Sequence, residues 1–135
     1  MPERPEVETV RRGLADLLPG QAVVRATVFD SPKSFPNSPT DVQQFLYGAH
    51  VTAVRRRAKV LMIDLDTRYS LVIHLKMTGQ LIFRGANSFA GGHPNDSLIG
   101  ELPDKSTRVQ IDFTDGSHLF FNDQRKFGWM KLMPT

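Results

Sequence analysis

The first apolar residues of the chain recur at helical spacing. Within residues 5–18 the apolar side chains fall every three or four positions and share one face; they are Val7, Val10, Leu14, Leu17 and Leu18. Pro5 suits a first helical position, and Glu8 favours the positive end of the helix dipole and can pair with Arg12 one turn later. Pro19-Gly20 ends the pattern. We therefore predict a helix over residues 5–18.

After this helix, short runs of alternating or β-branched residues predict strands. A short helix is predicted at 39–47, with Ser38 as its N-cap. Thr114-Asp115-Gly116-Ser117 is a hairpin turn signal. Segments 30–38 and 85–106 are rich in turn-forming residues and are predicted to be loops, of which the second is long enough to suggest a functional or mobile segment. The predicted strands cover 21–29, 49–57, 59–66, 69–76, 79–84, 107–113, 117–122 and 128–133.

The composition changes this picture in three ways. A length of 135 residues fits one domain, so the strands and hairpins predict a single antiparallel sandwich or barrel. No apolar run approaches the roughly 20 residues of a membrane span, and the N-terminus lacks a secretory signal, so a cytoplasmic location without membrane contact is predicted. Cys is absent and the four His residues lack ligand spacing, which argues against disulfides and a zinc site.

Positive charge is concentrated in two blocks. The net charge is +3, a mild excess that weakly indicates a polyanionic partner. One block covers residues 55–59, in which Arg55, Arg57 and Lys59 would share one face of a strand. The other is Arg125-Lys126, far away in the sequence but able to meet the first in the fold. Phosphate contact and a solvated strand edge are equally good interpretations of the first block.

The opening MPERPEVE has a feature that the helix does not explain. Removal of Met1 would leave Pro2 with a free secondary amine, and a terminal amine has a pKa well below that of a Lys side chain. Such an amine can attack an aldehydic carbon and form a cationic iminium. Glu3 lies next to it and could move protons. An ordinary helix start is the alternative interpretation.

Two further segments combine polar and large apolar residues. In HLKMTGQL, at 74–81, Val72, His74 and Lys76 would share one strand face, and Met77 falls in a turn. In FNDQRKFG, at 121–128, an extended loop would point Arg125 and Phe127 the same way. An exposed aromatic beside an Arg can wedge into a base stack. Each large apolar residue could instead belong to the core, which is the commoner place for Met and Phe.

Together these segments resemble the N-terminal domain of formamidopyrimidine-DNA glycosylase, the bacterial base-excision enzyme for oxidised purines. The family opens P-E-L-P-E-V-E after Met removal, and this chain has PERPEVE at 2–8. The family motifs R-R-x-K-Y-L, H-L-G-M-S-G and N-D-P-R-R-F-G resemble RRAKVL, HLKMTG and NDQRKFG here. The order of the motifs is also the same. The resemblance implies a mainly β fold with α: a two-layered antiparallel β-sandwich flanked by an N-terminal helix and a second short helix.

The resemblance also implies a catalytic function. Pro2 would attack the sugar C1′, expel the damaged base and form the iminium, after which β,δ-elimination cuts the strand. Glu3 would handle protons at the sugar, and Lys59 would hold phosphates beside the lesion. The substrates would be 8-oxoguanine and formamidopyrimidines, and the partner would be duplex DNA containing oxidised purines or abasic sites in the bacterial nucleoid.

The resemblance implies DNA contacts as well. His74 and Arg125 would touch the backbone, and Met77, Arg125 and Phe127 would fill the gap that the flipped nucleotide leaves, with Phe127 as the wedge. Arg57 and Lys126 of the basic blocks would join this surface.

Several departures from the family pattern limit what the resemblance implies. Arg4, Lys76 and Gln124 replace the family's Leu, Gly and Pro. Residues 1–135 are expected to form the catalytic domain alone, without the family's helix–two-turn–helix and zinc-finger domains, so no cofactor is expected in this chain. A non-catalytic DNA-binding or scaffold domain of the same fold is the alternative function.

Overall fold

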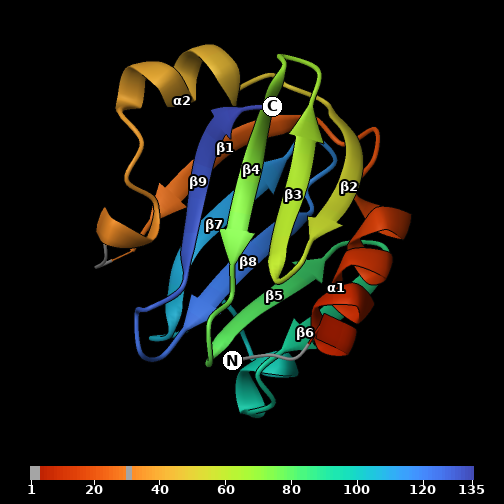
Figure 1. Cartoon of the computed structure of the whole chain (residues 1–135), viewed down its shortest axis with the longest axis vertical. Helices are drawn as coiled ribbons and strands as arrows, with labels where there is room; N and C mark the ends of the chain where they lie inside the picture. The colour runs from red at the N-terminus through yellow and green to blue at the C-terminus, as the bar shows by residue number, and fades with distance from the viewer. Residues whose placement is uncertain (1–3, 30–31) are drawn as a thin grey trace.

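The computed structural model describes residues 4–29 and 32–135, apart from the side chains of residues 4 and 5, and contains two antiparallel sheets packed face to face (Figure 1). The five-stranded sheet has the order β1-β7-β8-β5-β6, with bounds Val23–Val28, Thr107–Phe113, His118–Asp123, Gly79–Arg84 and Ser88–Gly92. The four-stranded sheet has the order β2-β3-β4-β9, with bounds Val51–Arg57, Val60–Leu65, Tyr69–His74 and Trp129–Pro134. The predicted two-layered sandwich is therefore confirmed.

Alternation along the strands builds the core between the two sheets. In β3 every second residue is buried, and the register pairs Leu61 and Ile63 with the buried Ile73 and Leu71 of β4. Strand β2 departs from this alternation at a bulge near its start. The fully buried side chains of the sandwich include Leu61, Ile63, Ile73, Leu81, Ile111, Leu119 and Phe121. Burial of each such side chain contributes about 1.5–3 kcal/mol.

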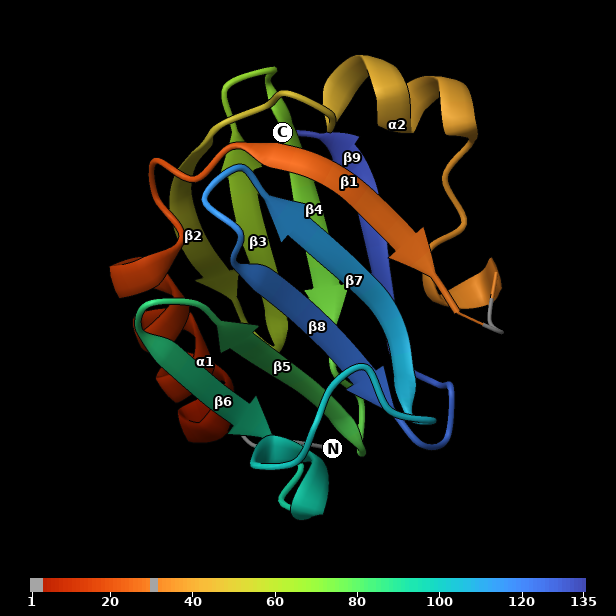
Figure 2. The ribbon, with the colours of Figure 1, turned by 180° about the vertical axis from the view of Figure 1, so that it is seen from behind.

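Helix α1, Arg4–Leu17, covers one side of the sandwich (Figure 2). Its apolar stripe faces inward, and Val7, Val10 and Leu14 are at most 1% exposed. Glu8 accepts hydrogen bonds from Arg11 and, as predicted, from Arg12 at 2.9 Å. It also accepts one at 2.9 Å from Arg56 of β2, so the first half of the helix is tied to the neighbouring strand. No helix of the described residues is long and apolar enough to cross a bilayer.

Helix α2, Pro39–Phe45, lies at the upper end of the sandwich in Figure 1. As predicted, Ser38 caps this helix by accepting a hydrogen bond from the amide of Asp41. The segment that leads into α2 also closes the outer edge of β9. The Asn37 side chain donates to the carbonyl of Leu132 and accepts from its amide, both at 2.7 Å. An Asn amide here replaces the backbone of a neighbouring strand.

The prediction that 85–106 is a loop is wrong. The segment contains β6, which pairs with β5, and a 3-10 helix at Asp96–Leu98. The glycines that suggested a loop are required by close approach: a Cβ on Gly91 would lie 2.7 Å from Val10 of α1. On Gly92, at φ +107°, it would lie 2.4 Å from the carbonyl oxygen of Gly79.

Two strand boundaries also differ from the prediction, and both move a lysine. Lys59 lies in the turn between β2 and β3, after Ala58 at φ +54°, so it does not share a strand face with Arg55 and Arg57. Strand β4 ends at His74, and Lys76 occupies a turn at φ +55°. Both lysines therefore lie in turns at the end of the sheet.

Candidate nucleic-acid interface

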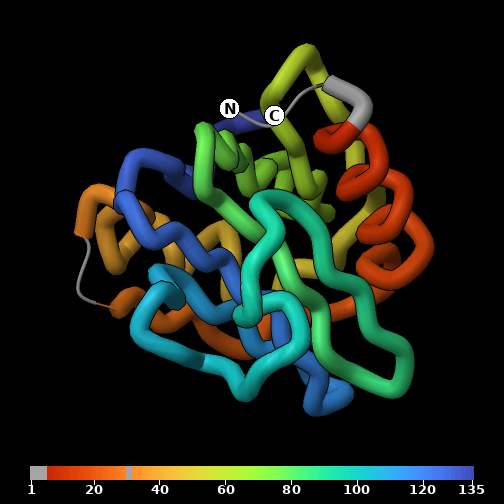
Figure 3. The backbone as a smooth tube through the Cα atoms, turned by 90° about the horizontal axis from the view of Figure 1, so that it is seen from below, coloured from red at the N-terminus to blue at the C-terminus, as the bar shows by residue number. Residues whose placement is uncertain are grey.

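Three connecting segments meet at the lower end of the sandwich in Figure 1, the end that Figure 3 shows from below. They are the turn at 58–59, the turn at 75–78 and the loop at 124–128. Strand register brings them together, because Val60 pairs with His74 and His74 pairs with Trp129. Gly79 likewise pairs with Asp123 in the other sheet. The two predicted basic blocks therefore reach the same end of the molecule.

Two large apolar side chains project from this end. Phe127 is 65% exposed and Met77 is 52% exposed. Arg125 connects their loops, since its Nη1 lies 3.9 Å from the sulfur of Met77. The core interpretation of Met77 and Phe127 is therefore wrong. Exposure of such residues on two adjacent loops is costly in water and indicates a surface that contacts a partner.

The loop that carries Phe127 also borders a cleft. The cleft has a volume of about 600 Å³ and is lined by Pro32, Lys33, Arg125, Lys126, Phe127, Gly128 and Trp129. Lys131 places its Nζ 4.6 Å from the centroid of the Trp129 ring. Aromatic faces interleaved with cations are typical of surfaces that bind single-stranded or unstacked nucleic acid.

His74 is half-buried at the end of β4. Burial is the main cause that lowers its pKa, and the positive charges of Lys76 and Lys59 lower it further. The ring is therefore neutral at neutral pH. Its Nδ1 accepts a hydrogen bond of 3.1 Å from the amide of Lys76, so the proton of the neutral ring lies on Nε2. His74 thus presents an N–H donor that carries no charge.

The basic block at 55–59 divides into structural and free cations. Arg55 forms an ion pair with Asp64 at 2.5 Å, and Arg56 forms one with Glu8 at 2.9 Å. Arg57 and Lys59 have no ion-pair partner among residues 4–29 and 32–135, and Arg57 is exposed. Lys126 is also exposed and adopts φ +60°. Arg57, Lys59 and Lys126 are therefore available to an anionic partner.

Pro2 and Glu3 lie outside the described residues. Helix α1 begins two residues after Pro2, and Glu8 in its second turn binds Arg56, three residues before Lys59. The pKa of Glu8 is held below its usual range by hydrogen bonds from Arg11, Arg56 and Arg12. This ion cluster ties the start of α1 to the hairpin that carries Lys59.

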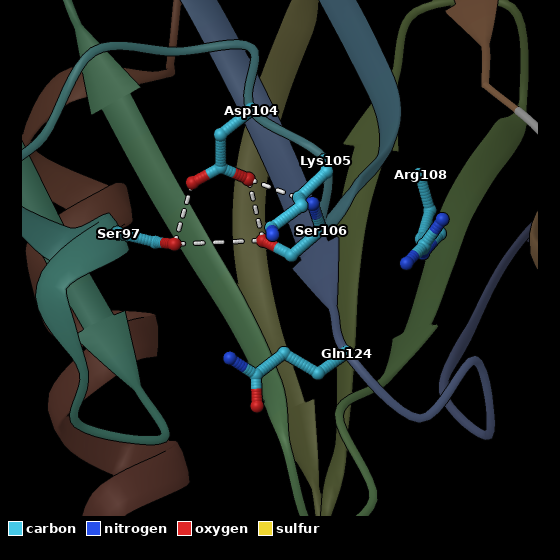
Figure 4. A pocket seen from close by; sticks show the side chains of 6 residues that line it. All are labelled: Ser97, Asp104, Lys105, Ser106, Arg108 and Gln124. Carbon is cyan, nitrogen blue, oxygen red and sulfur yellow. Dashed lines mark hydrogen bonds between the residues drawn. The ribbon is translucent and has the colours of Figure 1, made fainter.

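A second cavity lies beside the 124–128 loop and was not expected from the sequence (Figure 4). Its volume is about 450 Å³, and it is lined by Ser97, Asp104, Lys105, Ser106, Arg108 and Gln124. Burial raises the pKa of Asp104, but hydrogen bonds from Ser106 and Ser97 outweigh it, and the net shift is downward. Arg108 is buried and donates from Nε to the carbonyl of Asp123 at 2.8 Å. Arg108, one of the residues that line this cavity, therefore holds the backbone at the base of the loop.

The comparisons with known proteins agree with these observations. The family model described as the formamidopyrimidine-DNA glycosylase N-terminal domain matches residues 1–130. The chain belongs to this family. The formamidopyrimidine-DNA glycosylase of Jannaschia sp. is 44% identical over 137 residues, and that of Paracoccus denitrificans is 40% identical over 134 residues. The match covers 100% and 99% of this chain but 46% of each relative, so the chain spans about half the length of these glycosylases.

Solved structures of the formamidopyrimidine-DNA glycosylase family have the same fold. The Lactococcus lactis Fpg in complex with abasic-site DNA matches 99% of this chain and 44% of its own, with a TM-score of 0.79 and 26% identity. The same enzyme with Fapy-dG DNA matches with a TM-score of 0.79 and 26% identity over 98% of this chain and 44% of its own. Both neighbours hold damaged DNA.

Proposed function

We propose that the chain is the N-terminal catalytic domain of a base-excision repair enzyme, a DNA glycosylase and abasic-site lyase that removes 8-oxoguanine and formamidopyrimidines from duplex DNA. Its membership of the formamidopyrimidine-DNA glycosylase family supports this proposal. The observation that carries it is the exposed group formed by Met77, Arg125 and Phe127. Two large apolar side chains exposed beside an Arg are of the kind that can occupy a gap in a base stack.

The geometry of this group suits an extruded nucleotide. Chemistry at C1′ requires the damaged nucleotide to leave the stack, which costs a few kcal/mol. Phe127 would wedge between the remaining bases, while Met77 and Arg125 fill the vacated space. Lys59 and Arg57 would neutralise phosphates of the damaged strand. His74 would donate a hydrogen bond from its Nε2–H group to a phosphate oxygen.

Pro2 would supply the chemistry. Its amine nitrogen attacks C1′ as the bond to the base breaks, and the base leaves with the bonding electrons and takes up a proton. Glu3 assists ring opening by proton transfer, which yields the iminium between Pro2 and C1′. The iminium acidifies the C2′ proton, so that loss of this proton expels the 3′ phosphate, and a second elimination expels the 5′ phosphate.

Borohydride trapping tests the proposal. The chain is incubated with duplex DNA that contains an abasic site, reduced, and weighed by intact-mass spectrometry, which also reports whether Met1 is present. We expect a covalent adduct on chains that lack Met1. Pro2→Gly replaces the secondary amine with a primary amine, whose imine carries a positive charge only when protonated, so the variant should give less adduct, while salt-dependent binding to the same duplex stays nearly unchanged.

Other outcomes would contradict the catalytic proposal. Binding that weakens with salt, without an adduct on Met-free chains, would instead show a non-catalytic DNA-binding domain. The exposed cations Arg57 and Lys126 favour this second candidate if the first fails, because their contacts with phosphate do not depend on Pro2.

A further inference from the structure

Asp123 is a fully buried carboxylate at the end of β8, directly beneath the loop at 124–128. A buried carboxylate is costly unless hydrogen-bond donors surround it. Asp123 satisfies this requirement with donors from both of the exposed loops. Its carboxylate accepts from the amides of Arg125 at 3.1 Å and Gly128 at 2.5 Å, and from the hydroxyl of Thr78.

These donors come from segments far apart in sequence. Arg125 and Gly128 flank Phe127 in one loop, while Thr78 directly follows Met77 in the other. The backbone of Asp123 is fixed as well: its amide donates to the carbonyl of Ser106, and its carbonyl accepts from Arg108, both at 2.8 Å. One side chain therefore links the two loops that expose apolar residues.

Close packing leaves these loops little freedom around Asp123. A Cβ on Gly128 would lie 3.0 Å from the Asp123 carboxylate and 2.9 Å from the carbonyl oxygen of His74. A Cβ on Gly79 would lie 2.3 Å from the carbonyl oxygen of Leu75, which closes the other turn. Glycine is thus required at both contacts, and the two loops pack as one unit.

We propose that Asp123 is the positioning residue that holds Met77, Arg125 and Phe127 in one rigid arrangement for insertion into damaged DNA. The proposal rests on the DNA-repair function proposed above. Asp123 itself would not touch DNA, because it is fully buried under the loop. A side chain that must enter a gap in a base stack gains affinity when its loop is ordered before binding, since less entropy is lost on contact.

The test uses a duplex with an abasic analogue opposite 2-aminopurine, whose fluorescence reports insertion without any cleavage. Asp123→Asn keeps the shape but turns an amide NH₂ toward backbone donors, so at least one bond is lost. We expect Asp123→Asn to lower the affinity for this duplex, measured by the 2-aminopurine fluorescence, by about tenfold or more. This is the effect expected from the loss of one or two charge-assisted hydrogen bonds. Binding to undamaged duplex, which depends on phosphate contacts, should change less than about twofold.

Two further variants keep the result interpretable. Asp115→Asn makes the same chemical change in the turn between β7 and β8, where Asp115 accepts from the amide and hydroxyl of Ser117, and it should leave insertion unchanged. Thr78→Val removes the link to the Met77 turn while it keeps the carboxylate. If Asp123→Asn fails to fold, Thr78→Val must reproduce the loss of insertion.

The outcomes separate the two proposals. Full insertion by a folded Asp123→Asn chain, or by Thr78→Val where Asp123→Asn does not fold, would overturn the role of Asp123 alone. A wild-type chain that binds the duplex without any change in 2-aminopurine fluorescence would overturn the role of Asp123 together with the wedge. Insertion that depends on Asp123 without borohydride trapping would contradict only the catalytic proposal.

Discussion

At the scale of single residues, Lys76 departs from the family pattern at a position where the backbone favours glycine. Lys76 adopts φ +55°, a left-handed conformation that costs a residue with a Cβ roughly 1 kcal/mol. Lys76→Gly should therefore raise the free energy of unfolding by about 0.5 kcal/mol, because the relief of strain exceeds the gain in unfolded-state entropy. Denaturant titration measures this change.

The same substitution should alter His74. Lys76 is one of two cations that lower the pKa of His74, after burial. Its removal should raise this pKa toward the ordinary value, which NMR titration of the ring would detect. Arg68→Gly is the matched control, since Arg68 adopts φ +66° in a turn at the other end of β4. Arg68→Gly should raise the free energy of unfolding without moving the pKa of His74. A shift of this pKa in both variants would refute the charge of Lys76 as its cause.

At the scale of elements, the ion cluster around Glu8 joins α1 to β2. The lowered pKa of Glu8 means that its carboxylate stabilises the fold above its unfolded pKa near 4.5. This stabilisation is lost as the pH falls below that value. Glu8→Gln should therefore lower the melting temperature by a few degrees at pH 7 and by progressively less under acid conditions.

Thermal unfolding at several pH values measures this effect, with Glu101→Gln as the control on an exposed carboxylate. Equal melting temperatures for the two variants at pH 7 would show that the cluster does not hold the helix. A loosened α1 should also reduce borohydride trapping, because this helix begins two residues after Pro2.

Periodicity predicted the elements well wherever a strand or helix has one buried face. The helix at 5–18, the cap at Ser38 and the hairpin at 114–117 depend on local residue chemistry, and the structure confirms them. Strand β6 was not predicted, because its glycines looked like loop residues. They are glycines because α1 and Gly79, which are remote in sequence, leave no room for a Cβ. Local residue propensity carries no information about contacts between distant segments.

The site was predictable only in part for the same reason. The motifs indicated Met77 and Phe127, but their exposure depends on how two distant loops pack. Asp123 falls just after the predicted strand at 117–122 and is not among the predicted site residues, whereas the structure shows it as a buried acceptor for three donors. The positions of Pro2 and Glu3 remain a prediction.

At the scale of the whole molecule, other segments of the chain contact part of each outermost strand. Helix α1 packs beside β2 and β6, while Gly48 and Ala49 exchange hydrogen bonds with Val23 at one end of β1. The outer edge of β9 instead relies on the Asn37 side chain. Contacts of this kind reduce the backbone that the edges of the sandwich offer to another chain.

The two hydrogen bonds of Asn37 therefore bear on solubility as well as on the fold. Asn37→Ala would leave the amide and carbonyl of Leu132 without partners, at a cost of about 1–3 kcal/mol, and would expose a strand edge ready to recruit a second molecule. We expect sedimentation velocity to show more self-association than in wild type or in Asn87→Ala, a change in an exposed turn. An unchanged distribution would contradict this. If self-association rises as expected, a single amide side chain keeps the protein dispersed in solution.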